Sequence, residues 1–376
     1  MMLFLWGVLP VLAFIGMIAY LLWKISGGID FFCKSISKKR KRIMTIIGLI
    51  ILLLPAVSVK ATWVLVLLHF AVILLVMDLI AWLIHKIWKK KEFPILWKRL
   101  YRSGVIAALL TCMVFVYGTY NIYHVIQTDY TVETAKAIQE DGYKILVVSD
   151  LHYGITLNQE QLQEEVTKMS GENADIVILD GDIVDESTTQ TQMQEAFQTL
   201  GKIANKYGVY YVYGNHDQNN YTSHPNYGRD ELADTIQQAG ITILDDEVET
   251  INDEIALIGR SDKSDPTKVR KTISELTANL DSAQEWIVLD HQPTEYEEVE
   301  NADCDMIVSG HTHGGQIWPA GLFAIALHLD DQSYGEETLN QLHAIVTSGI
   351  AGWGFPLRTE KHSEYIVINL KPVNGK

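Results

Sequence analysis

The 376-residue sequence divides into two parts of opposite charge. Residues 1–128 hold 15 Lys and Arg against 3 Asp and Glu, a net charge of +12, and the remaining residues hold 15 against 43, a net charge of −28. The acidic part argues against nucleic acid as a partner, because its mean field repels a polyanion.

The basic part contains four apolar segments, each close to the length that crosses about 30 Å of hydrocarbon as a helix. Buried helices of a soluble core are rarely this long and this free of charge. We therefore predict a four-span transmembrane domain over residues 1–127. The expected spans are residues 2–23, 43–59, 61–84 and 103–127.

The loops between these segments predict the orientation of the chain, since Lys and Arg are retained on the cytoplasmic side. Basic residues gather within 24–42 and within 86–102, whereas the opposite side shows only Lys60. This pattern predicts a multi-pass cell-membrane protein whose N-terminus and whose residues after the fourth span lie outside the cytoplasm. The basic loops could also bind anionic lipid head groups or nucleic acid, but the topology signal is the favoured interpretation.

The three cysteines add a weak indication of compartment. Cys33 lies in an expected cytoplasmic loop, Cys112 in a span and Cys304 in the outer domain, so no disulfide can form within a domain. An outer domain without disulfides is compatible with a bacterial cell envelope.

From Thr128 onward, short runs rich in Val and Ile alternate with amphipathic stretches, which predicts one α/β layered domain over residues 128–376. The expected strands are residues 143–149, 176–179, 209–213, 255–258, 286–289, 306–309, 344–347 and 365–370. The expected helices are residues 159–169, 188–206, 230–238 and 266–280.

Polar residues follow five of these strands directly, where open α/β sheets place their sites. They are Asp150 and His152, then Asp182, then Asn215 and His216, then His291, and finally His311 and His313. Glycines beside the last pair should let both imidazoles turn back to one point. Carboxylate, imidazole and amide oxygen together suit divalent Mn, Fe or Zn.

Each motif also has a plain structural interpretation. A GD after a strand is commonly a turn, which would account for Asp180 and Asp185. Asn215 could cap a helix, and His291 could be a loop histidine. The joint occurrence of five strand-end motifs is what favours a metal site.

The ordered motifs DxH, GDxxD, GNHD, a later lone His and GHTHGG resemble the calcineurin-like metallophosphoesterase superfamily over about residues 143–370. The runs SGHTHGGQIWP and SGIAGWGFPLR are similar to its membrane-associated bacterial phosphodiesterase type. The resemblance implies a layered sandwich of two sheets flanked by helices, with two divalent metal ions.

The same resemblance implies a role for each site residue. Asp150, His152 and His313 would bind one metal, Asn215, His291 and His311 the other, and Asp182 would bridge both. His216 would lie beside the phosphate as acid or charge stabiliser, and Asp217 would hold its ring.

These features predict a membrane-anchored, manganese-type two-metal phosphohydrolase that cleaves a phosphodiester or pyrophosphate bond. Two alternatives stay open. One is a phosphomonoesterase, and the other is a cell-envelope receptor or binding module whose metal site is structural.

An apolar stretch at 317–329, together with Trp353 and Phe355, lies beside the expected site. It could pack as core, or it could form an exposed membrane contact. A tether of about 15 residues between the fourth span and the first strand would hold the domain near the bilayer. We therefore predict that the site opens toward the membrane and takes a phosphate ester carried on a lipid.

Overall fold

The computed structural model describes residues 9–55, 61–87 and 94–373. The chain divides into two compact units, residues 1–117 and residues 118–376. Helix α6 (Val105–Tyr123) contributes its last six residues to the second unit.

The first unit is helical. Its elements are α1 (Leu9–Phe32), α2 (Lys38–Leu53), α4 (Ala61–Ile87), α5 (Ile95–Ser103) and most of α6. Among the described residues, three helices are long and apolar enough to cross a membrane: Val11–Phe32, Thr62–Ile87 and Val105–Tyr123.

The second expected span, residues 43–59, falls partly outside the described residues, which omit 56–60. Helix α2 covers its first part, but α2 has only 16 residues and begins with the basic run KKRKR. The described part of α2 is therefore too short to cross about 30 Å of hydrocarbon at 1.5 Å per residue. This span stays a prediction.

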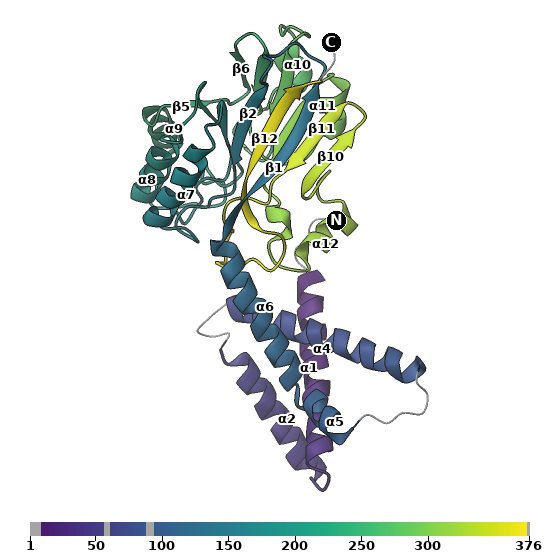
Figure 1. Ribbon diagram of the computed structural model, residues 1–376. Coiled ribbons are helices and arrows are strands. Elements are labelled where there is room, and N and C mark those ends of the chain that lie inside the picture. The colour runs from purple at the N-terminus through teal and green to yellow at the C-terminus, as the bar shows by residue number, and fades with distance from the viewer. Residues whose placement is uncertain (1–8, 56–60, 88–93, 374–376) are drawn as a thin grey trace. The chain divides into compact units, whose positions relative to one another are not determined.

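The second unit is a four-layer sandwich of two mixed six-stranded sheets between helices (Figure 1). The first sheet has the order β1-β12-β2-β3-β4-β5 and the second β10-β11-β9-β8-β7-β6. The expected α/β layered fold is therefore confirmed. The strands are β1 (Val125–Thr134), β2 (Tyr143–Val148), β3 (Ile176–Asp180), β4 (Val209–Val212), β5 (Ile241–Ile243), β6 (Glu247–Ile251), β7 (Ile255–Gly259), β8 (Glu285–Leu289), β9 (Met306–Ser309), β10 (Gly335–Leu339), β11 (Leu342–Val346) and β12 (Ser363–Pro372).

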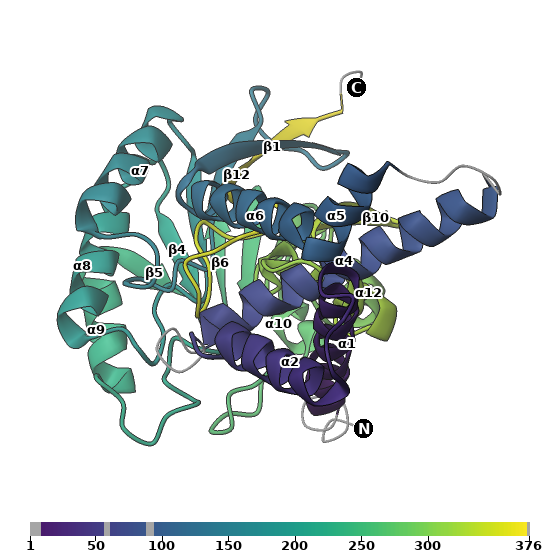
Figure 2. The ribbon, with the colours of Figure 1, turned by 90° about the horizontal axis from the view of Figure 1, so that it is seen from below.

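Three apolar clusters hold the layers together. One lies between the first sheet and helices α7 (Gln159–Gly171), α8 (Gln190–Leu200) and α9 (Arg229–Gln238). The second fills the space between the sheets. The third joins the second sheet to α10 (Ile273–Thr277) and α11 (Tyr296–Asn301). Figure 2 shows α7, α8 and α9 as one layer. The central strands are buried on both faces, which explains their continuous apolar runs.

Two expectations for this unit are corrected. The helix expected over 266–280 is only α10, because Asp262 and Asp265 accept backbone hydrogen bonds that form turns before it. The expected 15-residue tether is wrong as well. Strand β1 begins at Val125, with only His124 between it and the end of α6, and pairs in parallel with β12.

The apolar stretch after His313 is exposed, so the interpretation of this stretch as core is wrong. Helix α12 (Ala320–Leu327) buries only Gly321. The exposed side chains, which we call the α12 patch, are Trp318, Leu322, Phe323, Ile325, Leu327 and Leu329.

Candidate metal centre

The polar residues expected at five strand ends come together at one place in the second unit. Strands β2, β3 and β4 are parallel neighbours in the first sheet, and β8 and β9 are parallel neighbours in the second. The described residues offer two groups suited to a metal ion, Asp150 with His152 and His313, and Asp182 with His291 and His311. The carboxyl ends of the two sets of strands lie together, because ligand atoms that follow strands of both sheets are within 4.8 Å of one another in each group.

The first group is compact and buried. The Nε2 atoms of His152 and His313 are 3.2 Å apart, and His313 Nε2 lies 3.4 Å from Asp150 Oδ1. Two imidazole nitrogens this close to one carboxylate form a set of lone pairs that one cation can satisfy.

The second group includes the amide of Asn215. His311 Nδ1 lies 2.8 Å from Asn215 Oδ1, and His291 Nε2 lies 3.2 Å from Asp182 Oδ2. His311 and His313 thus belong to different groups, so the expectation that both imidazoles meet at one point is wrong.

Asp182 lies between the two groups. Its Oδ2 atom is 3.7 Å from His152 Nε2 of the first group as well as 3.2 Å from His291 Nε2 of the second. A carboxylate in this position can contact ions on both sides.

The ring of His291 is oriented as a metal ligand requires. Its Nδ1 lies 2.7 Å from the carbonyl oxygen of Asp180, to which it can donate its proton, and its Nε2 is buried without a hydrogen-bond partner among the described residues. A hydrogen bond from one ring nitrogen fixes the tautomer and leaves the other nitrogen free to bind a metal. The donor set and this orphaned nitrogen fit a divalent cation.

The ligands depend on unusual backbone geometry. Asp150, His152, Asp182, His311 and His313 all have a positive φ, between 40° and 68°. Residues other than glycine rarely adopt this conformation, and such strain clusters at functional sites. Gly314 and Gly315 adopt a positive φ as expected, and the two histidines adopt it as well, which was not expected.

Glycines are required where the loops touch the ligands. A Cβ at Gly214 would lie 2.2 Å from Asp182 Oδ1, and a Cβ at Gly310 would lie 2.5 Å from Asp150 Oδ2. The glycines of GNHD and SGH thus make room for the carboxylates.

Burial and charge set the protonation of the imidazoles. Burial and the neighbouring His291 lower the pKa of His311 to about 4, and burial together with His152 holds the pKa of His313 well below its usual value. Both rings are therefore neutral, as ligands must be. At His291, burial lowers the pKa, but the carboxylates of Asp182, Asp150 and Asp180 together more than offset burial and raise it. A bound metal would displace that proton.

His216 lies beside the ligand groups, because its ring centroid is 5.5 Å from that of His152 and its backbone N–H donates to Asp182 Oδ1. Its place beside a phosphate stays a prediction, but the partner of its ring differs from the expected one. Its Nδ1 lies 2.9 Å from Glu186 Oε2. Asp217 instead accepts backbone N–H groups from Asp182, Val184 and Gly214. Asp217 therefore fixes the loops after β3 and β4, and the expectation that it holds the ring of His216 is wrong.

Glu186 raises the pKa of His216. Burial lowers this pKa, yet the hydrogen bond to Glu186 and the charge of Asp182 more than offset the effect of burial. The rings of Tyr221 and Trp353 lie against the imidazole, with centroids 5.0 and 5.4 Å away.

We expect Glu186→Gln to lower kcat about 10- to 100-fold with little change in KM, because a hydrogen bond to a charged group contributes about 1.5–3 kcal/mol. Glu186→Asp should recover part of the loss. Steady-state kinetics on a phosphoester with the full-length protein would check this. An unchanged kcat would show that Glu186 does not orient the ring.

Three further residues support the site, although no single motif identifies them. Asp185, which could have been a plain turn residue, accepts from Ser187 in a turn but also lies 3.4 Å from His152 Nδ1. Gln316 donates to the carbonyls of Trp353, Phe355 and Leu357, and buried Arg358 donates to the carbonyl of His313. The hydrogen bonds of Gln316 and Arg358 join SGHTHGGQ to SGIAGWGFPLR, which explains why both runs lie beside the site.

Comparison with known proteins identifies the family. The sequence profile of the family described as calcineurin-like phosphoesterase matches residues 143–315. The metallophosphoesterase YkoQ of Bacillus subtilis (strain 168) is 30% identical over 51% of this chain and 71% of its own length. The chain belongs to the calcineurin-like phosphoesterase family.

Other relatives carry additional sequence. A transmembrane protein with a metallophosphoesterase domain from Danio rerio is 27% identical over 72% of this chain and 63% of its own length. The metallophosphoesterase Cj0846 of Campylobacter jejuni is 28% identical over 61% of this chain. The chain covers about three fifths of that relative, 59% of its length. Among solved structures, TT1561 of Thermus thermophilus is similar with a TM-score of 0.39 at 12% identity, over 56% of this chain and 91% of that one.

Proposed function

We propose that the protein is a membrane-anchored phosphohydrolase that uses two metal ions, bound by Asp150, His152 and His313 on one side and by Asn215, His291 and His311 on the other. The position of Asp182 Oδ2, within 4 Å of a histidine from each group, is the observation that carries this proposal. In this role Asp182 would contact both ions, and its negative charge would offset their repulsion.

Two divalent ions supply a clamp for a phosphate and a hydroxide nucleophile near neutral pH. The proposed ligands contain two carboxylates, Asp150 and Asp182, and a neutral amide, Asn215. Two divalent ions would therefore leave the centre positively charged, which suits a phosphate ester. Mn, Fe and Zn all accept this mixture of ligands.

His216 has the contacts expected of an acid or charge stabiliser beside the phosphate. Glu186 occupies its Nδ1, which leaves Nε2 as the nitrogen available to a substrate. The raised pKa favours the imidazolium form, which can donate a proton to a leaving oxygen.

The proposed bond is a phosphodiester or a pyrophosphate. The full-length protein in detergent, loaded with Mn, should hydrolyse a bis-aryl phosphate faster than the mono-aryl ester. The reverse order would favour the phosphomonoesterase alternative. Two bound metals without hydrolysis of either ester would favour a binding module.

We propose a multi-pass arrangement with the phosphoesterase unit outside the cytoplasm. The basic segments follow α1 and α4, so both helices would end on the cytoplasmic side. For α4 to begin outside the cytoplasm, residues 38–60 would have to cross the membrane back to that side. This requirement supports the predicted second span. Helix α6 would cross once more and lead into β1.

We also propose that the substrate is carried on a lipid, and the α12 patch is the feature that supports this. Its members are from 36% exposed at Trp318 to 60% at Ile325. Water-soluble surfaces rarely expose so many large apolar side chains together, and such patches mark membrane or ligand contacts.

Hydrogen bonds connect this patch to the end of α6. Within the second unit, Gly118 and Asn121 of α6 bind the segment 358–361 through its backbone. The same segment holds the start of α12, because Thr359 accepts from Trp318 N and Glu360 from Gly321 N. The α12 patch is therefore connected through these hydrogen bonds to the end of α6, where the proposed span would leave the membrane.

We expect the double variant Trp318→Ser and Phe323→Ser to raise KM for a lipid-linked pyrophosphate by roughly tenfold or more, because burying each ring in the interface would contribute on the order of 1.5–3 kcal/mol. A soluble aryl ester should be hydrolysed as before. Val269→Ser is the matched control, since Val269 is exposed in the same unit but outside the patch. Equal losses on both substrates would contradict a lipid contact.

A further inference from the structure

The first unit contains a pair of neighbouring cavities that the proposed hydrolysis does not use. The first has a volume of about 470 Å³ and the second about 910 Å³. They share Phe32, Cys33 and Met44 in their walls, so they are adjacent, and residues of α1, α2, α4 and α5 line them.

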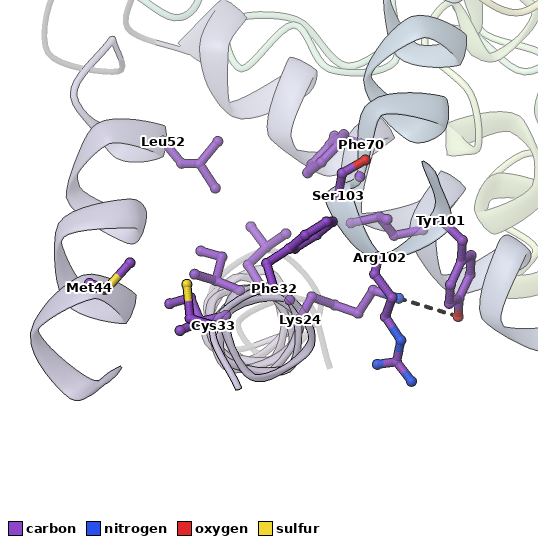
Figure 3. Close-up of a pocket in the computed structure, with 15 residues that line it drawn as sticks. Lys24, Phe32, Cys33, Met44, Leu52, Phe70, Tyr101, Arg102 and Ser103 are labelled. Atoms are coloured by element: carbon purple, nitrogen blue, oxygen red, sulfur yellow. Dashed lines mark hydrogen bonds between the residues drawn. The ribbon is translucent and has the colours of Figure 1, made fainter. Parts of the chain in front are cut away.

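The first cavity is predominantly apolar. Figure 3 shows Met44 and Leu52 of α2 across the cavity from Phe32 of α1 and Phe70 of α4. Two cations line its wall, Lys24 and Arg102. The charge of Lys24 is neutralised, because its Nζ lies 2.6 Å from Asp78 Oδ1. This interior suits hydrocarbon better than a polar solute.

The second cavity is basic. Lys34, Arg40 and Arg99 line it, and no Asp or Glu is among the described residues of either wall. Within the described parts of the chain, none of these three cations pairs with a carboxylate, whereas nearby Lys41 pairs with Asp30. The three charges are therefore available to an external anion.

The wall of the second cavity includes the start of an amphipathic helix. Helix α5 exposes Ile95, Leu96 and Trp97 and carries Lys98, Arg99 and Arg102. Apolar and basic faces on one short helix are typical of a segment that lies in the membrane interface.

We propose that these cavities bind one anionic phospholipid, with its phosphate against Lys34, Arg40 and Arg99 and an acyl chain in the apolar cavity. Basic pockets between membrane helices recognise anionic head groups, which the cytoplasmic leaflet supplies. This site lies in the helical unit and takes a lipid as a bound ligand, and no bond of that lipid is cleaved.

The test uses the purified full-length protein in neutral detergent. Native mass spectrometry would follow adducts with dioleoyl phosphatidylglycerol, with dioleoyl phosphatidylcholine and with inorganic phosphate, and Tm would be measured at each concentration. We expect a one-to-one phosphatidylglycerol adduct that raises Tm. Equal retention of phosphatidylcholine, or competition by inorganic phosphate, would overturn the proposal.

Variants locate the site. Arg40→Gln with Arg99→Gln should weaken phosphatidylglycerol binding roughly 30-fold, at about 1 kcal/mol for each charge near the lipid. Lys39→Gln with Lys86→Gln removes the same charge from exposed positions outside both cavities and should leave binding unchanged. Met44→Trp fills the shared wall without changing charge and should also weaken binding. Equal effects of the two double variants, or full binding by Met44→Trp, would show that the cavities are not the site.

Discussion

Asp182→Asn is expected to lower the hydrolysis of a bis-aryl phosphate by about 10³-fold or more, because two-metal stabilisation contributes several kcal/mol to the transition state. The carboxylate of Asp182 lies between the two ligand groups and is buried. An amide offers one neutral oxygen in place of two anionic ones, so the repulsion between the ions is no longer offset. Metal content should fall below two ions per chain.

Asp180→Asn is the control for this experiment. Asp180 lies two residues away at the end of β3 and is buried too, but its carboxylate belongs to neither ligand group. This variant should keep two ions and most of the activity. Full activity in Asp182→Asn, or the same loss in both variants, would exclude a bridging role.

His216→Gln is expected to lower kcat by about 10² to 10⁴-fold, the range for loss of a general acid or base. Both metal ions should remain, because the ring pairs with Glu186 and lies outside the two ligand groups. Activity and metal content measured on the same preparation would check this. His224→Gln, at an exposed loop position, should behave as the unaltered protein.

Loss of metal together with activity would identify His216 as a ligand. Comparison with Glu186→Gln adds a second test. If Glu186 acts by orienting the ring, Glu186→Gln should cause no further loss once His216 has been replaced.

The sequence predicts the central strands of the two sheets but not their edge strands. All eight expected strands are present, whereas β1, β5, β6 and β10 were not expected as strands. These four form the outer edges of the two sheets. Edge strands bury little and often carry charge, as in Glu247–Ile251 and Gly335–Leu339, so they lack the apolar run that marks a central strand.

The site likewise has features that a short stretch of sequence predicts and features that depend on tertiary packing. The predicted ligands directly follow predicted strands, so the sequence alone identifies Asp150, His152 and Asp182. The hydrogen-bond partner of His216 depends on how the loop after β3 packs against the loop after β4. The sequence predicted Asp217 as this partner because it is adjacent to His216 in GNHD, whereas the partner is Glu186. Sequence also could not decide whether 317–329 is core, because an apolar run has the same composition in either place.

The most direct test of the two-metal proposal is a metal titration of the purified full-length protein. After removal of metal with a chelator, hydrolysis of a bis-aryl phosphate would be measured while Mn is added in known amounts per chain, with bound metal determined in parallel. We predict no turnover without metal and a rise in activity that reaches its plateau at two bound ions. A plateau at one ion, or two bound ions with no hydrolysis of any phosphoester, would contradict a two-metal phosphohydrolase.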